Sequence, residues 1–66
     1  MRENDVFVLE EPLQASIIGN HDAVMLPVGT VVTVVHVFGE ESSPQAYEVE
    51  AFLSDINAYA LATFQI

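Results

Sequence analysis

The sequence predicts a small all-β domain, either an SH3-like barrel or a strongly bent antiparallel sheet of four or five strands. Residues 30–38 are almost entirely β-branched or aromatic, which is typical of a long strand. Residues 47–50 (Tyr-Glu-Val-Glu) alternate strictly between apolar and acidic side chains, as in a strand with one buried face. The chain has 66 residues, so residues 1–66 are expected to form one domain near the lower size limit for independent folding.

The first half of the chain should supply two strands and an irregular segment between them. Residues 5–10 are a compact apolar run that closes at Glu11 and Pro12, and they predict the first strand. Residues 13–26 predict a long excursion that contains a short hairpin, with Gly19 and its neighbour Asn20 in the turn. Residues 30–38 are apolar on both faces, so this strand should lie centrally in the sheet.

The second half should begin with a polar loop at 39–44 and a strand from Tyr47. Strict alternation would place Phe52 on the acidic outer face, whereas a β-bulge at Ala51 would turn Phe52 inward, and the bulge is our expectation. A turn is expected at 54–57. Residues 59–66 then predict the last strand, with a short helix as the alternative because alanines are frequent there.

Charge narrows the range of partners. The chain has ten Asp and Glu, a single arginine and no lysine, for a net charge of −9. Such a chain is poorly suited to nucleic acid or to an anionic membrane surface, but it suits a basic protein. The candidate acidic partner surface consists of Glu40, Glu41, Glu48 and Glu50.

Neither an active site nor a cofactor site is indicated, and we expect a protein that is not an enzyme and has no cofactor. The serines lie in predicted loops, and no spacing places one of them beside His21 or His36 as a nucleophile would require. No zinc-binding pattern is present. An alternative function is the binding of a small ligand or metal ion by the 11–28 loop and its histidine, His21.

Self-association is expected, most simply as a homodimer. The apolar surface that so short a chain can bury barely offsets the conformational entropy of ordering it, and without cysteine no disulfide can help. Residues 59–66 also carry no charge, lysine or proline that would protect a sheet edge. The candidate contact residues are Tyr59, Leu61, Phe64 and Ile66, together with Phe52 if it faces outward.

Three further features bear on location and family. The absence of cysteine fits a reducing, cytoplasmic compartment, and the polar residues after Arg2 do not resemble a secretory leader. Gly29-Thr30-Val31-Val32, Tyr47-Glu48-Val49-Glu50 with Phe52, and Tyr59 to Phe64 resemble a family of very small bacterial proteins, the domain-of-unknown-function family 4926. The resemblance implies an SH3-like fold and no catalytic residues. We therefore expect a non-enzymatic interaction module, and an accessory or inhibitor protein of a mobile element would be a suitable setting.

Overall fold

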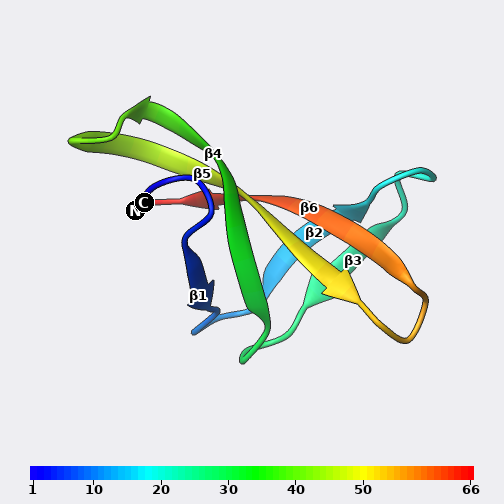
Figure 1. Ribbon diagram of the computed structural model, residues 1–66. Coiled ribbons are helices and arrows are strands. Elements are labelled where there is room, and N and C mark those ends of the chain that lie inside the picture. The colour runs from blue at the N-terminus through cyan, green and yellow to red at the C-terminus, as the bar shows by residue number, and fades with distance from the viewer.

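The computed structural model describes all 66 residues and contains six antiparallel strands and no helix (Figure 1). The strands are β1 (Val6–Val8), β2 (Leu13–Ile17), β3 (Ala23–Leu26), β4 (Val31–Glu40), β5 (Ser43–Leu53) and β6 (Ala58–Gln65). They form one sheet in the order β1-β4-β5-β6-β2-β3, which curls into a half-barrel. The all-β class and the strong bending are confirmed. The sheet has six strands because the excursion at 13–26 contains both β2 and β3.

The curled sheet encloses a core of small side chains. Four of its ten buried residues are alanines, and the largest fully buried side chains are only leucine and valine. Because the inward side chains are small, strands on opposite sides of the narrow half-barrel can approach one another closely. The core residues are Leu9, Ala15, Leu26, Val32, Val34, Tyr47, Val49, Ala51, Ala60 and Ala62.

The expected bulge at Ala51 is wrong. The ladder between β5 and β6 runs without interruption from Ala46–Gln65 to Leu53–Ala58. Ala51 is buried in the core and Phe52 is 51% exposed on the outer face. The small methyl group of Ala51 continues the inward series after Val49, so alternation needs no correction.

The irregularities occur elsewhere in the β4–β5 ladder: Val35 of β4 is the extra residue between the pairs Val34–Val49 and His36–Glu48, and Gln45 of β5 is the extra residue between Phe38–Ala46 and Gly39–Pro44. Both faces of β4 are apolar in sequence, so alternation gave no signal for the shift at Val35. The loop expected at 39–44 is also wrong, because β4 continues to Glu40 and β5 begins at Ser43 in a tight hairpin. The predicted last strand is confirmed as β6, and the helical alternative is not formed.

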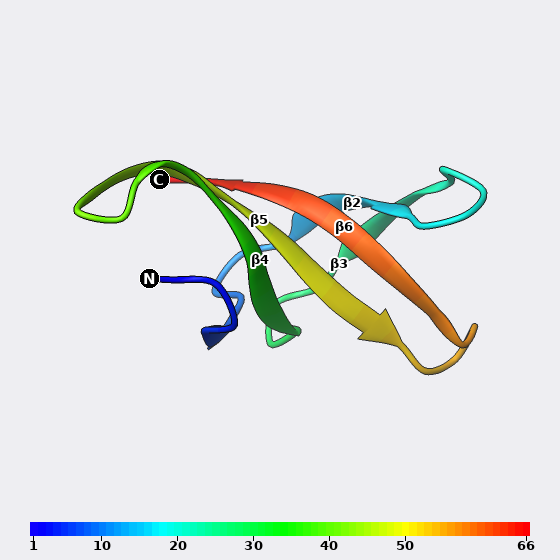
Figure 2. The same cartoon turned by 45° about the horizontal axis from the view of Figure 1, so that its top comes forward.

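The β4–β5 hairpin and the β5–β6 turn project from opposite ends of the molecule (Figure 2). The predicted hairpin near Gly19 is confirmed as the β2–β3 turn, in which Gly19 has a φ of 110°. None of the chain forms a helix long and apolar enough to cross a membrane.

Candidate interaction surfaces

The outer face of the sheet carries five large apolar side chains that are about half exposed: Val6, Val8, Val31, Phe52 and Tyr59. We call this set the apolar outer face. Val8 is paired with Val31 across β1 and β4. Phe52 is paired with Tyr59 across β5 and β6, with ring centroids 5.0 Å apart. Exposed large apolar side chains that gather on one face are a common mark of an interaction site.

The apolar outer face has two halves, which are Val6, Val8 and Val31 on β1 and β4, and Phe52 and Tyr59 on β5 and β6. The register of the sheet relates these halves. Thr33 pairs with Glu50. Val31 comes two residues before Thr33 and Phe52 comes two residues after Glu50, and because the strands are antiparallel both steps lead toward the same end of the sheet. Two residues is one full period of a strand, so both side chains point to the same outer face. The β4–β5 ladder ends at Thr33–Glu50, so no backbone pairing joins the halves, and the half-buried carboxylate of Glu50 lies at their margin.

The residues predicted for self-association are divided between two faces. Phe52, Tyr59 and the half-buried Leu61 lie on the outer face. Phe64 lies on the inner face, packed against the core with its ring 5.1 Å from that of Phe7. Ile66, at the end of β6, is 67% exposed. Sequence reasoning missed Val6, Val8 and Val31, because Val-Phe-Val at 6–8 is apolar at every position and contains no alternation that would show which side chains face outward.

The four predicted acidic residues form two separate groups. Glu40 ends β4 and Glu41 lies in the hairpin turn that follows, and both are exposed. Glu48 and Glu50 are half-buried in β5, opposite His36 and Thr33 respectively. The structure therefore does not bring the four carboxylates into one surface.

The two histidines lie apart from any cluster of ligands. His21 is exposed in the β2–β3 turn with a φ of 62°, and the turn is held by the Asp22 N–H, which donates to Asn20 Oδ1 at 2.9 Å. The His36 ring packs edge-on against Phe38, 4.8 Å away. No three His, Cys, Asp or Glu side chains lie together in a way that could hold a metal ion.

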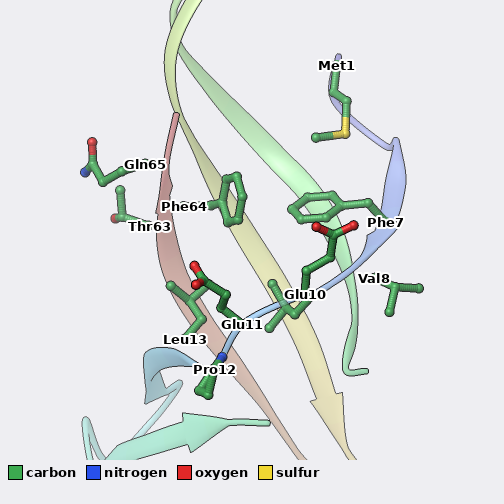
Figure 3. A pocket seen from close by; sticks show the side chains of 11 residues that line it. Met1, Phe7, Val8, Glu10, Glu11, Pro12, Leu13, Thr63, Phe64 and Gln65 are labelled. Atoms are coloured by element: carbon green, nitrogen blue, oxygen red, sulfur yellow. The ribbon is translucent and has the colours of Figure 1, made fainter. Parts of the chain in front are cut away.

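A groove of about 800 Å³ opens between the end of β6 and the segment that joins β1 to β2 (Figure 3). β2 pairs with β6 only at Ser16–Leu61 and Ile17–Ala60, and beyond these pairs the strands separate. One wall of the groove is the end of β6, and the opposite wall is the segment from Phe7 to Leu13. The Phe7 and Phe64 rings meet edge to face in the groove, with centroids 5.1 Å apart, and Glu10 and Glu11 line it on the same wall as Phe7 (Figure 3).

Comparison with known proteins found no matching family model, no matching curated protein and no matching solved structure. The resemblance to family 4926 therefore stays a prediction, and the surfaces described above are the basis for a function.

Proposed function

We propose that this chain is a non-enzymatic, acidic interaction module that forms a homodimer through the apolar outer face and offers its carboxylates to a basic protein. The observation that carries the proposal is the set of five half-exposed large apolar side chains on one face of the sheet. Water contact with such side chains costs free energy that a second apolar surface would recover.

The weakness of the core supports association. Only leucine and valine are fully buried among the larger side chains, while Phe52 and Tyr59 remain half exposed. Small domains that cannot bury enough apolar surface commonly gain stability from a disulfide, a metal or a partner subunit. This chain has no cysteine for a disulfide and no group of three His, Asp or Glu side chains that could hold a metal ion, so a partner subunit is the simplest source.

A dimer interface of ordinary size would occupy a modest share of this chain's surface. A specific interface buries roughly 600–1,000 Å² on each partner. The whole chain exposes 4443 Å², so such an interface would take about one seventh to one quarter of the surface. A second copy is a better occupant than an unrelated apolar protein, because an isologous contact needs only one patch that is complementary to itself.

The net charge of −9 opposes dimer formation, and this constrains where the contact lies. None of the five side chains of the apolar outer face is a carboxylate, and Glu50 lies at its margin. The remaining carboxylates stay in solvent, where they repel acidic molecules and attract basic ones. A cytoplasmic location forms part of this proposal, since a chain without cysteine suits a reducing compartment.

Light scattering at micromolar concentration tests the proposed homodimer. The expected solution mass is twice the chain mass of 7.2 kDa. A mass of 7.2 kDa that does not change with concentration would contradict the proposal.

A further inference from the structure

The end of β6 has an open edge. Alternate residues of a strand direct their N–H and C=O groups to opposite neighbours. The Tyr59 carbonyl accepts the Ile18 N–H from the β2 side at 2.9 Å, whereas the Ile66 N–H donates toward Gln45 of β5. By the same alternation, the backbone groups of Thr63 and Gln65 point to the β2 side, where no strand is paired with them.

The groove beside this edge has the dimensions and chemistry of a site for an extended chain. It lies along Thr63–Gln65 and is bounded on its other side by Glu10 and Glu11. Three strand residues extend over about 10 Å, so the open edge can accept one short segment. An unpaired edge next to a groove is the geometry by which a peptide adds as an extra strand.

The charges of the groove determine the class of occupant. Glu10 and Glu11 are both exposed, and they line the same groove as the Phe7 and Phe64 rings (Figure 3). The Met1 ammonium also lies in this region, where it donates to the Tyr47 hydroxyl at 3.0 Å and keeps its positive charge. The two carboxylates of the groove outnumber this one cation, so the lining carries a net negative charge. A lysine or arginine side chain would meet carboxylates and aromatic faces together, which favours a cation on two grounds.

We infer that the groove binds an extended basic segment of a partner protein, which pairs with β6 at Thr63 and Gln65 and places a lysine or arginine between Phe64 and the two glutamates. This inference rests on the basic partner of the proposed function and adds its site and mode of binding. A second copy of this chain is a poor occupant, because its only basic side chain is Arg2 and its net charge is −9.

Three end-capped hexapeptides test the inference by fluorescence anisotropy with the full chain at low salt. The first alternates lysine with valine and can form a strand. The second alternates lysine with proline, so it has the same charge but lacks the N–H groups at alternate positions. The third alternates glutamate with valine. We expect binding of the lysine–valine peptide, binding of the lysine–proline peptide that is weaker by about ten-fold or more, and no binding of the glutamate–valine peptide.

Charge variants separate the groove from general attraction to an acidic protein. The double variant Glu10→Gln with Glu11→Gln should weaken binding of the lysine–valine peptide by about ten-fold. The control is Glu40→Gln with Glu41→Gln, which removes the same charge at the β4–β5 hairpin turn, outside the groove lining. Both double variants are compared at about 150 mM salt, where the Debye length is ~8 Å, and the control should change affinity by less than about two-fold. Equal effects of the two double variants would overturn the groove and leave the basic partner in place.

Two backbone readouts test the added strand. Thr63→Pro removes an N–H that the β5–β6 ladder does not use, and it should weaken peptide binding while the far-ultraviolet spectrum stays that of the wild type. In the unmodified chain, the amides of Thr63 and Gln65 should gain protection from hydrogen exchange when the lysine–valine peptide binds. Binding without that protection, or equal binding of the lysine–proline peptide, would overturn strand addition. Failure of the wild type to bind either lysine peptide would overturn the basic partner itself.

Discussion

Phe52 and Tyr59 face each other across β5 and β6, with their ring centroids 5.0 Å apart and their planes inclined by 58°. Each ring is nevertheless about half exposed to solvent. An aromatic pair of this geometry is worth about 0.5–1.5 kcal/mol beyond the area that it buries. The pair is thus formed in the monomer and still leaves a preorganised apolar surface for a partner.

The register of β5 depends on Ala51. Deleting Ala51 would turn Phe52 into the space of a buried methyl group, and overpacking of this kind should destabilise the fold by about 1–3 kcal/mol or more. The matched variant Ala51→Gly keeps the register and should cost only about 0.5–1 kcal/mol. Urea unfolding of the two variants measures the difference. A deletion variant as stable as the wild type would show that Phe52 can occupy the inner face.

The core should be sensitive at its few larger side chains. Leu26 is 1% exposed at the end of β3, and Leu26→Ala should lower the free energy of unfolding by about 2–5 kcal/mol. Its neighbour Met25 is 57% exposed, so Met25→Ala should change stability by less than about 0.5 kcal/mol. Thermal unfolding of both variants at one protein concentration checks this pair. Similar losses would mean that the inward and outward faces of β3 are wrongly assigned.

Much of the fold could be predicted from strong local patterns. The strand at 30–38, the last strand and the hairpin at Gly19 each have a signal that does not depend on the rest of the chain. The inner and outer faces were harder to predict near Ala51. Sequence reasoning expects the larger apolar residue to be inside, but a narrow half-barrel has room for alanine and leaves Phe52 outside.

Gly39 should be the least replaceable glycine. Its φ is 90° and a Cβ placed there would lie 3.2 Å from the Gln45 backbone nitrogen and the Ser43 carbonyl oxygen. Gly29 has nearly the same φ, 91°, but a Cβ there would meet nothing within 4 Å. Gly29→Ala should therefore cost about 1 kcal/mol for backbone conformation alone. Gly39→Ala should cost measurably more in denaturant unfolding, and equal losses would contradict the tight hairpin at 39–44.

The candidate surfaces could be predicted only in part. Phe52 and Tyr59 were identified from their apolar character, but Phe64 was assigned to the same contact although it points inward. The groove could not be predicted, because it depends on where β2 leaves β6, and no local pattern in Leu13–Ile17 encodes that separation. From the sequence alone, Glu10 and Glu11 are interpreted as solvated residues at the end of a strand. In the structure they lie on the opposite side of the groove from Phe64.

Salt should stabilise this protein. At about 10 mM salt the Debye length is ~30 Å, comparable with the longest molecular dimension of 36 Å, so the ten carboxylates repel one another throughout the fold. At about 150 mM the Debye length is ~8 Å and most of that repulsion is screened. The melting temperature should rise on the order of 5 °C over this range, equally in sodium and potassium chloride. A falling melting temperature would indicate that attractive ion pairs dominate.

The central claim is that the apolar outer face carries self-association, and a matched pair of variants tests it most directly by sedimentation equilibrium. Phe52 and Ile56 are both 51% exposed, but only Phe52 belongs to the apolar outer face, since Ile56 lies in the β5–β6 turn. We predict a dimer for the wild type and for Ile56→Glu. We predict a folded monomer for Phe52→Glu, and the same for Val31→Glu in the other half of the face. A wild-type monomer, or an unchanged dimer in both Phe52→Glu and Val31→Glu, would contradict the claim.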